Sequence, residues 1–467
     1  MLEDHENNEQ DRIMAAVLDF EEVINSNTNK YFDPELLEGI IDYYIFKSDY
    51  EKALKCVDFC IEQHPNYMVF QLRKAQICSS LGDVKLSLEL LSKVEVLDPN
   101  NEEVYLTKAS CYSQLKDHER AIKYFEKVLE IAEGDDTLDD VLLDLAIEYQ
   151  HVGEMYKAID ALKKALMLNP QNETVLYELA YCYDQVNNLE DSIQFYKFYL
   201  EDNPYSFTAW FNLGNSYSKM GDFVKAIDAY KFCTSINEDF APAYFNMATC
   251  YNEQERIEEA IESLNECVRV DPEDAQTIGY LGELYEKKED YNKAIEFYVK
   301  AIEMDDQLAA AWFGIGMVKV NLEEFDEAIS YILKSLDIEE NNSEYWQFLG
   351  LCYYKERRFN EAEEAYVRAI SADPTNSEAL IDFTKIKEEY NKQDALDFLE
   401  TIVTIYNIND ESKAYLVKLY WELGFRTDAM FCFRDLIRTN PNSIKSLFLH
   451  FPEAKEIPEF RKCVDGY

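Results

Sequence analysis

Residues 207–240 read FTAWFNLGNSYSKMGDFVKAIDAYKFCTSINEDF, and close variants of these 34 residues recur along nearly the whole chain. Trp210, Leu213 and Tyr217 are spaced by three and four residues, which is the apolar stripe of an amphipathic helix. A second stripe of the same kind follows at Ala226, Ile227, Tyr230 and Cys233. Gly221 lies between the two stripes, where glycine adopts a left-handed turn at the least cost. The stretch therefore predicts two short helices joined by a tight turn.

Columns of small residues show how regular the repetition is. One column consists of Ala53, Ser87, Ala121, Ala158, Ser192, Ala226, Ala260, Ala294, Ala328, Ala362, Ala395 and Ala429. A second column, twelve positions earlier, contains Ala75, Ala109, Ala146, Ala180, Gly214, Ala248, Gly282, Gly316 and Gly350. Small side chains allow the two helices of a repeat to approach closely. A fixed period of this length is typical of a solenoid of stacked helix pairs, not of a globule with one core.

The repeated pattern resembles the tetratricopeptide repeat (TPR) family. The residues that carry the resemblance in one repeat are Trp210, Leu213, Gly214, Tyr217, Gly221, Ala226 and Tyr230. The resemblance covers about residues 34–443. It implies an all-α, right-handed superhelical solenoid of about twelve tandem helix-turn-helix repeats with helical caps. It implies little about the partner, because the same fold serves unrelated systems.

The repeats also predict the organisation of the chain. We expect three segments: a polar N-terminal tail and capping helix at 1–33, with the helix at 11–24; the repeat array at 34–443; and a C-terminal capping helix at 444–467. The period is interrupted by a short insertion at 134–138 and by one missing residue near 391–394. Each interruption is either a hinge or a harmless change of loop length, and surface loops tolerate such changes.

Composition limits the partner and the compartment. The chain has 92 acidic and 45 basic residues, which gives a net charge of −47. This charge disfavours nucleic acids and anionic membranes and suits a basic protein partner. No apolar run is long enough for membrane insertion, and the first residues lack the pattern of a signal peptide. We therefore expect an acidic cytoplasmic protein.

The cysteines and histidines do not indicate a chemical site. Cysteines recur at two repeat positions: Cys111, Cys182, Cys250 and Cys352 at one, and Cys60, Cys233 and Cys267 at the other. Such positions are typical of reduced thiols packed between helices. Cys56, Cys60 and His64 lie on one helical stripe, but no fourth ligand is near them in the sequence. With no recognisable catalytic motif either, we expect no enzyme activity, no metal and no cofactor.

The resemblance also implies a binding surface. In the family, the first helix of each repeat lines a concave groove through its positions 2, 5, 9, 12 and 13. The candidate groove residues chosen on this basis are Tyr177, Tyr181, Asp184, Phe211, Asn215, Phe245, Thr249, Asn252, Glu253, Glu283, Glu286 and Phe313. Aromatic and acidic groups together suit a peptide that has apolar anchors and Lys or Arg. The alternative is that Tyr177, Phe211 and Phe245 pack against the adjacent repeat.

These observations favour a scaffold or adaptor that binds a peptide segment or protein in the concave groove. Two other functions stay open: a regulatory peptide sensor, and a structural subunit of a larger enzyme or secretion complex. Self-association into a homo-oligomer along the repeat edges also stays open.

Overall fold

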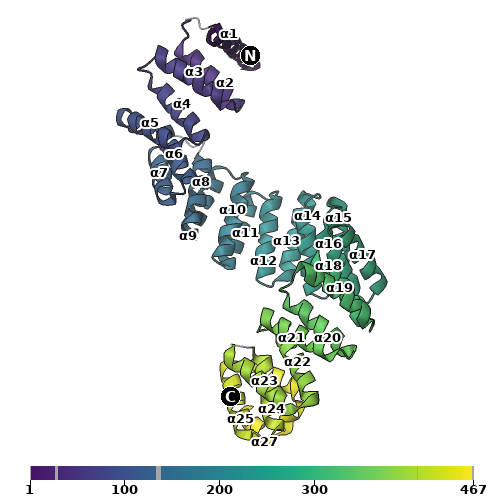
Figure 1. The fold of residues 1–467 in the computed structure, drawn as a ribbon. Helices are drawn as coiled ribbons and strands as arrows, with labels where there is room; N and C mark the ends of the chain where they lie inside the picture. The colour runs from purple at the N-terminus through teal and green to yellow at the C-terminus, as the bar shows by residue number, and fades with distance from the viewer. Residues whose placement is uncertain (1, 27–29, 133–137, 407–408, 465–467) are drawn as a thin grey trace. The chain divides into compact units, whose positions relative to one another are not determined.

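The computed structural model describes residues 2–26, 30–132, 138–406 and 409–464. Every regular element in these residues is helical, and the chain forms two compact halves, Met1–Glu238 and Asp239–Tyr467. Six consecutive helix pairs lie in each half, and neighbouring helices within a half pack side by side (Figure 1). These pairs confirm the predicted all-α solenoid of tandem repeats.

The helix bounds follow the repeat. The N-terminal half contains α1 (Leu2–Ser26), α2 (Pro34–Phe46), α3 (Tyr50–Gln63), α4 (Met68–Ser80), α5 (Val84–Leu97), α6 (Glu102–Gln114), α7 (His118–Ile131), α8 (Leu138–His151), α9 (Met155–Leu168), α10 (Glu173–Gln185), α11 (Leu189–Asp202), α12 (Phe207–Lys219) and α13 (Phe223–Ile236). The C-terminal half contains α14 (Ala241–Glu253), α15 (Ile257–Val270), α16 (Ala275–Lys287), α17 (Tyr291–Met304), α18 (Ala309–Asn321), α19 (Phe325–Ile338), α20 (Ser343–Lys355), α21 (Phe359–Ala372), α22 (Ser377–Tyr390), α23 (Lys392–Ile405), α24 (Asp410–Glu422), α25 (Arg426–Thr439), α26 (Ile444–His450) and α27 (Pro458–Val464). Even-numbered helices from α2 to α24 are the first helices of their repeats.

In eleven of the twelve repeats, the turn between the two helices is made by one residue in the left-handed conformation. The residues are Ser48, Gly82, Lys116, Gly153, Asn187, Gly221, Glu255, Glu289, Glu323, Arg357 and Gly424. An acidic or amide side chain then begins many of the second helices, as where Asp222 Oδ1 accepts a hydrogen bond from the Lys225 backbone at 3.3 Å. In the eleventh repeat Asn391, with φ −158°, follows α22 directly and α23 begins at Lys392. The missing residue predicted near 391–394 is therefore the left-handed one.

The small-residue columns lie where the two helices of a repeat touch. Ala226 is fully buried, and so are most members of its column. A Cβ on Gly214 would lie 2.5 Å from Tyr230 Cε1, so this glycine makes room for the ring of the second helix. Where the column contains Ser87, its hydroxyl donates to the Ala75 carbonyl at 2.7 Å. Close approach of the helices thus explains both columns.

First helices and second helices form different layers. Successive first helices contact each other, as α10 and α12 do in the N-terminal half and α16 and α18 do in the C-terminal half. No contact of similar extent joins successive second helices of the repeats anywhere in the described part of the chain. Because the first helices are the more crowded layer, they form the inner side of the stack within each half.

The two ends differ from what the sequence predicted. Helix α1 begins at Leu2, so the segment 1–10, expected as a polar tail, is helical from its second residue. That segment contains no glycine or proline to interrupt a helix. At the other end, two short helices, α26 and α27, replace the single capping helix expected at 444–467, because Pro452 and Pro458 interrupt it. Phe460 of α27 is fully buried against Phe433 of α25 and closes the core of the last repeat.

The expected insertion at 134–138 lies outside the described residues except for Leu138, which begins α8. Among the helices that the structure describes, none combines the length and the apolar character needed to cross a membrane.

Candidate functional site

The N-terminal half presents two exposed tyrosines on a first helix. Tyr177 and Tyr181 are one helical turn apart on α10 and are 43% and 47% exposed. Asp184, at the end of the same helix, forms an ion pair with Lys219 of α12, with 2.5 Å between Asp184 Oδ2 and Lys219 Nζ. The tyrosine rings are therefore available on the surface, whereas the aspartate joins two neighbouring repeats.

Phe211 and Asn215 on α12 contact a residue of their own repeat. Their partner is Tyr230 of α13, whose ring centroid lies 5.9 Å from that of Phe211. The Tyr230 hydroxyl donates to Asn215 Oδ1 at 2.8 Å. Tyr230 reaches the first-helix face because Gly214 leaves space for its ring. Phe211 and Asn215 are only half-buried, so part of each side chain still faces outward.

In the C-terminal half, α14 contacts Tyr280 of α16 through two of the candidate residues. The rings of Phe245 and Tyr280 are 5.6 Å apart, and Asn252 Nδ2 donates to the Tyr280 hydroxyl at 3.0 Å. Thr249 donates to the carbonyl of Phe245 one turn earlier at 3.2 Å, and Glu253 is exposed. The first helices of two successive repeats are thus linked across this face by an aromatic contact and a hydrogen bond.

Two glutamates follow on α16. Glu283 is exposed and pairs with Lys287 at 2.8 Å. Glu286 is more enclosed and accepts hydrogen bonds from Tyr298 at 3.0 Å and Asn321 at 3.2 Å. Burial raises the pKa of Glu286, and the nearby charge of Glu283 adds to this, although the two hydrogen bonds oppose it. This part of the face therefore has an excess of negative charge.

Phe313 on α18 is engaged in packing. Its ring lies 4.4 Å from that of Tyr345 and 5.7 Å from that of Phe348, both on α20. Phe313 therefore packs against the adjacent repeat. Of the three residues for which such packing was the alternative interpretation, Phe245 contacts Tyr280 of the next repeat, Phe211 contacts Tyr230 of its own repeat, and Tyr177 is exposed.

A cavity of about 440 Å³ opens on the same face in the C-terminal half. It is lined by Phe245, Thr249, Gln276, Gly279, Tyr280, Glu283, Tyr298, Leu308, Ala310 and Ala311. Sequence reasoning selected Phe245, Thr249 and Glu283 but missed the others. The available signal was a gap: from the fifth to the ninth repeat, position 5 is aromatic at Tyr177, Phe211, Phe245 and Phe313, but is glycine at Gly279.

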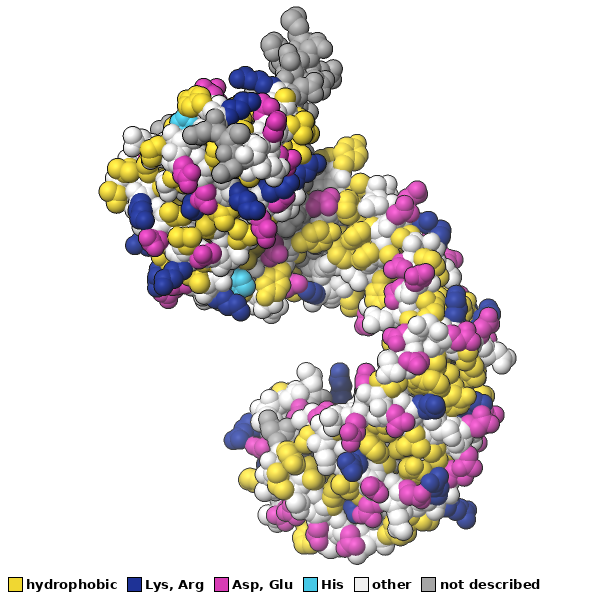
Figure 2. Space-filling view, turned by 45° about the horizontal axis from the view of Figure 1, so that its top comes forward, with side chains coloured by type: hydrophobic (Ala, Val, Ile, Leu, Met, Phe, Trp, Pro, Cys, Tyr) yellow, Lys and Arg dark blue, Asp and Glu magenta, His cyan; other side chains and the backbone are white. Residues whose placement is uncertain are grey.

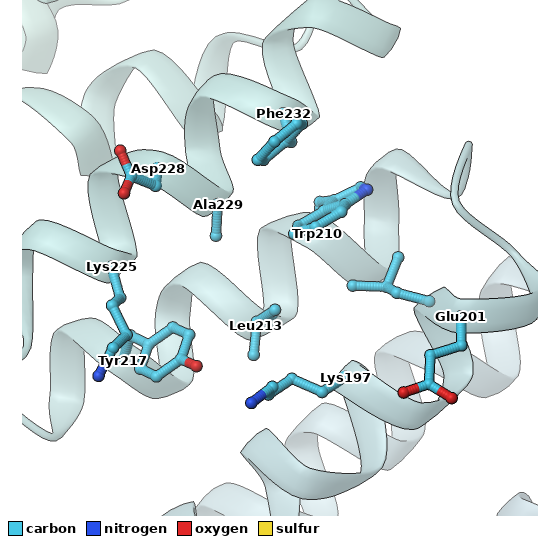
Figure 3. Close-up of a pocket in the computed structure, with 10 residues that line it drawn as sticks. Lys197, Glu201, Trp210, Leu213, Tyr217, Lys225, Asp228, Ala229 and Phe232 are labelled. Atoms are coloured by element: carbon cyan, nitrogen blue, oxygen red, sulfur yellow. The ribbon is translucent and has the colours of Figure 1, made fainter.

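A second cavity, of about 380 Å³, lies in the N-terminal half between α11, α12 and α13 (Figure 3). Its apolar wall includes Trp210 and Phe232, whose rings stack with centroids 4.5 Å apart. Lys197 and Lys225, with Glu201 and Asp228, surround this wall. The cavity is formed mainly by second helices, so sequence reasoning, which considered only first helices, did not predict it. Its mixed charges do not indicate one kind of ligand.

The remaining candidates for chemistry are occupied in packing. Cys56 and Cys60 are fully buried with their sulfurs 4.0 Å apart, and His64 Nε2 lies 3.0 Å from the Phe32 carbonyl. Within the ranges that the structure describes, no three His, Cys, Asp or Glu side chains are arranged to hold a metal ion. On the face drawn in Figure 2, acidic side chains are spread among hydrophobic ones, and the described residues form no broad basic area.

Comparison with known proteins finds the same repeat. Family models described as tetratricopeptide repeat match residues 101–171 and 239–307, 153–214, 207–240, 309–342 and 343–376, which together exceed half of the chain. No curated protein matches.

Three of the solved structures that match this chain have low sequence identity to it. MamA is 24% identical over 37% of this chain and 93% of its own, with a TM-score of 0.33. YrrB, described as a TPR protein with an unusual peptide-binding site, is 22% identical over 40% of this chain and 96% of its own, with a TM-score of 0.33. A chain of the APC/C hetero-tetramer Cut9–Hcn1 is 13% identical over 96% of this chain and 95% of its own, with a TM-score of 0.40.

Proposed function

Because the chain belongs to the tetratricopeptide repeat family, we propose that it is a protein–protein interaction scaffold that binds an extended peptide segment along its first helices. The observation that carries this proposal is the combination of partly exposed aromatic rings and carboxylates on the inner layer of each half. Tyr177 and Tyr181 provide the rings in one half. Phe245, beside Glu283 and a cavity, provides the corresponding surface in the other. Aromatic side chains supply contact area, and carboxylates select the charge of the partner.

The partner that fits this surface is a peptide with apolar anchors and basic residues. The chain has a net charge of −47, so its field attracts basic partners and accelerates their association. The two cations described above beside the candidate residues, Lys219 and Lys287, each pair with an acid of the same face. An acidic peptide would meet a negative surface with little compensation.

The test is affinity purification from the native cell at low salt, followed by mass spectrometry. The surface variant is Tyr177→Ala with Tyr181→Ala, which removes exposed rings and leaves the core intact. The matched control is Tyr156→Ala with Phe198→Ala, which removes two rings that are 65% and 63% exposed on second helices. We expect a basic partner to be recovered with the parent chain and the control but depleted with the surface variant.

Two results would contradict this function. Retention of the same partner by the surface variant would place binding outside the first-helix face. Recovery of one stoichiometric complex that neither variant changes would instead favour a structural subunit of a larger assembly. A short peptide that binds and slows amide hydrogen exchange along the array would favour the sensor.

A further inference from the structure

Gly279 is a glycine that the packing of the helices does not require. At Gly214, Gly282, Gly316 and Gly350, a Cβ would come within 3.0 Å of a side chain of the second helix. A Cβ on Gly279 would meet only Leu308 Cδ2 at 3.4 Å and Ala301 Cβ at 3.9 Å, which are ordinary contacts. Its backbone is helical within α16. Glycine inside a helix destabilises it by roughly 0.5–1 kcal/mol relative to alanine.

The missing side chain creates the cavity on the first-helix face. The equivalent positions in the repeats on either side are Phe245 and Phe313, so the aromatic column has a gap one residue wide at Gly279. The residues that line the cavity with Gly279 include Tyr298, Leu308, Phe245 and Ala310. The resulting volume, about 440 Å³, is in the range of pockets that bind small apolar groups. Because its walls are largely apolar, an apolar group is the natural occupant.

A carboxylate forms part of the cavity wall. Glu283 lines the cavity directly and is exposed. Glu286 lies about one turn further along the same helix, α16. Lys287 pairs with Glu283 at 2.8 Å, so this cation lies beside two acids of one helix.

We propose that the cavity over Gly279 binds one aromatic or branched aliphatic side chain of an extended peptide, and that Glu283 binds a Lys or Arg close to that side chain in the same peptide. This inference rests on the proposed peptide-binding function and names the chemistry that it recognises. Charge complementarity favours a basic peptide over a neutral apolar ligand, because Glu283 lies in the cavity wall and the chain has a net charge of −47.

The experiment selects peptides from a random display library on the full chain at low salt. We expect enriched peptides to share an aromatic residue, Leu or Ile within a few positions of Lys or Arg. Gly279→Phe, which restores the aromatic column and fills the cavity, should weaken the enriched peptide by about tenfold or more. Gly279→Ala adds only one methyl group and is the matched control, expected to stay within about threefold of the parent. Far-UV circular dichroism and the unfolding midpoint check that both variants fold.

A charge reversal provides a second test that does not depend on filling the cavity. Glu283→Lys should weaken the enriched basic peptide and strengthen a version in which its Lys or Arg is replaced by Glu. If neither Gly279→Phe nor Glu283→Lys changes affinity, peptides bind elsewhere, which overturns this inference and leaves the proposed function standing. If no peptide is enriched on the parent chain, both the proposed function and this inference are overturned.

Discussion

Two glycines on one helix are predicted to respond in opposite ways to the same substitution. Gly279 and Gly282 are three residues apart on α16, and Gly279→Ala and Gly282→Ala give chains of identical composition. We expect Gly279→Ala to stabilise the protein and Gly282→Ala to destabilise it. Because both changes replace glycine by alanine, their effects on the unfolded chain are closely similar, and the difference reports on the folded state.

The magnitudes follow from the contacts. At Gly279 the new methyl group lies at ordinary distance from Leu308, so the gain is that of helix propensity, about 0.5–1 kcal/mol. At Gly282 it would lie 2.7 Å from Tyr298 Cδ1 and 2.8 Å from Cε1. The ring cannot retreat freely, because Gly314 also abuts it. Overpacking costs about 1–3 kcal/mol, so a net loss of up to about 2.5 kcal/mol remains after the gain in propensity.

Hydrogen exchange measured by mass spectrometry is the appropriate assay, because repeat arrays open locally and need not unfold in one step. Peptides from α16 and α17 should exchange more slowly in Gly279→Ala and faster in Gly282→Ala than in the parent. Adding Tyr298→Leu to Gly282→Ala copies the Ala248 and Leu264 pair of the preceding repeat and should recover part of the loss. Equal exchange in the two glycine variants would refute this account of the packing.

Three further predictions concern the repeat itself. Ala226→Leu should lower the unfolding midpoint by an amount equivalent to about 1–3 kcal/mol, because that position is fully buried, and an unchanged midpoint would contradict the repeat phase. Glu289 has φ 61°, so Glu289→Gly should raise the free energy of unfolding by up to about 1 kcal/mol. Glu296→Gly, in the middle of α17, should lower the free energy of unfolding by about the same amount. Urea unfolding of both variants tests the left-handed turn. Burial raises the pKa of Glu286, so the folded state binds its proton more tightly, and stability should fall as pH rises through the folded pKa. Glu286→Gln should flatten that part of a stability-against-pH curve, and an unchanged slope would contradict the assignment.

The repeat predicted most of the fold because each repeat packs only against its neighbours. The spacing of Ala226 from Gly214 is sufficient to place two helices and their contact in the nine repeats that share both small residues. Left-handed turns were predicted where glycine marks them, as at Gly221, but residues such as Glu289 adopt the same conformation without a compositional signal. Only their register in the repeat reveals them. The ends were predicted least well, because α1 and α27 have a repeat on one side only, so the repeat pattern does not fix their lengths.

The candidate surface was less predictable than the fold. Its residues share the first-helix face, but sequence position does not show whether an aromatic ring is exposed or packed. Phe313 contacts two rings of α20, whereas Tyr181 is 47% exposed, and both occupy groove positions in the sequence. The difference arises from side chains in the next repeat, namely Tyr345 and Phe348, which the position of Phe313 alone does not reveal.

In a chain built from one repeated motif, departures from the motif are the better guide to function. A residue that follows the repeat, such as Ala226, is explained by packing against its neighbours. Gly279 breaks an aromatic column, weakens its own helix and relieves no close contact, so packing leaves it unexplained. A binding cavity explains why a glycine that weakens its helix is present, because natural proteins often keep a destabilising residue where function needs it. If Gly279→Phe both stabilises the protein and abolishes peptide binding, these two results together will show that Gly279 lowers the stability of the helix and makes binding possible.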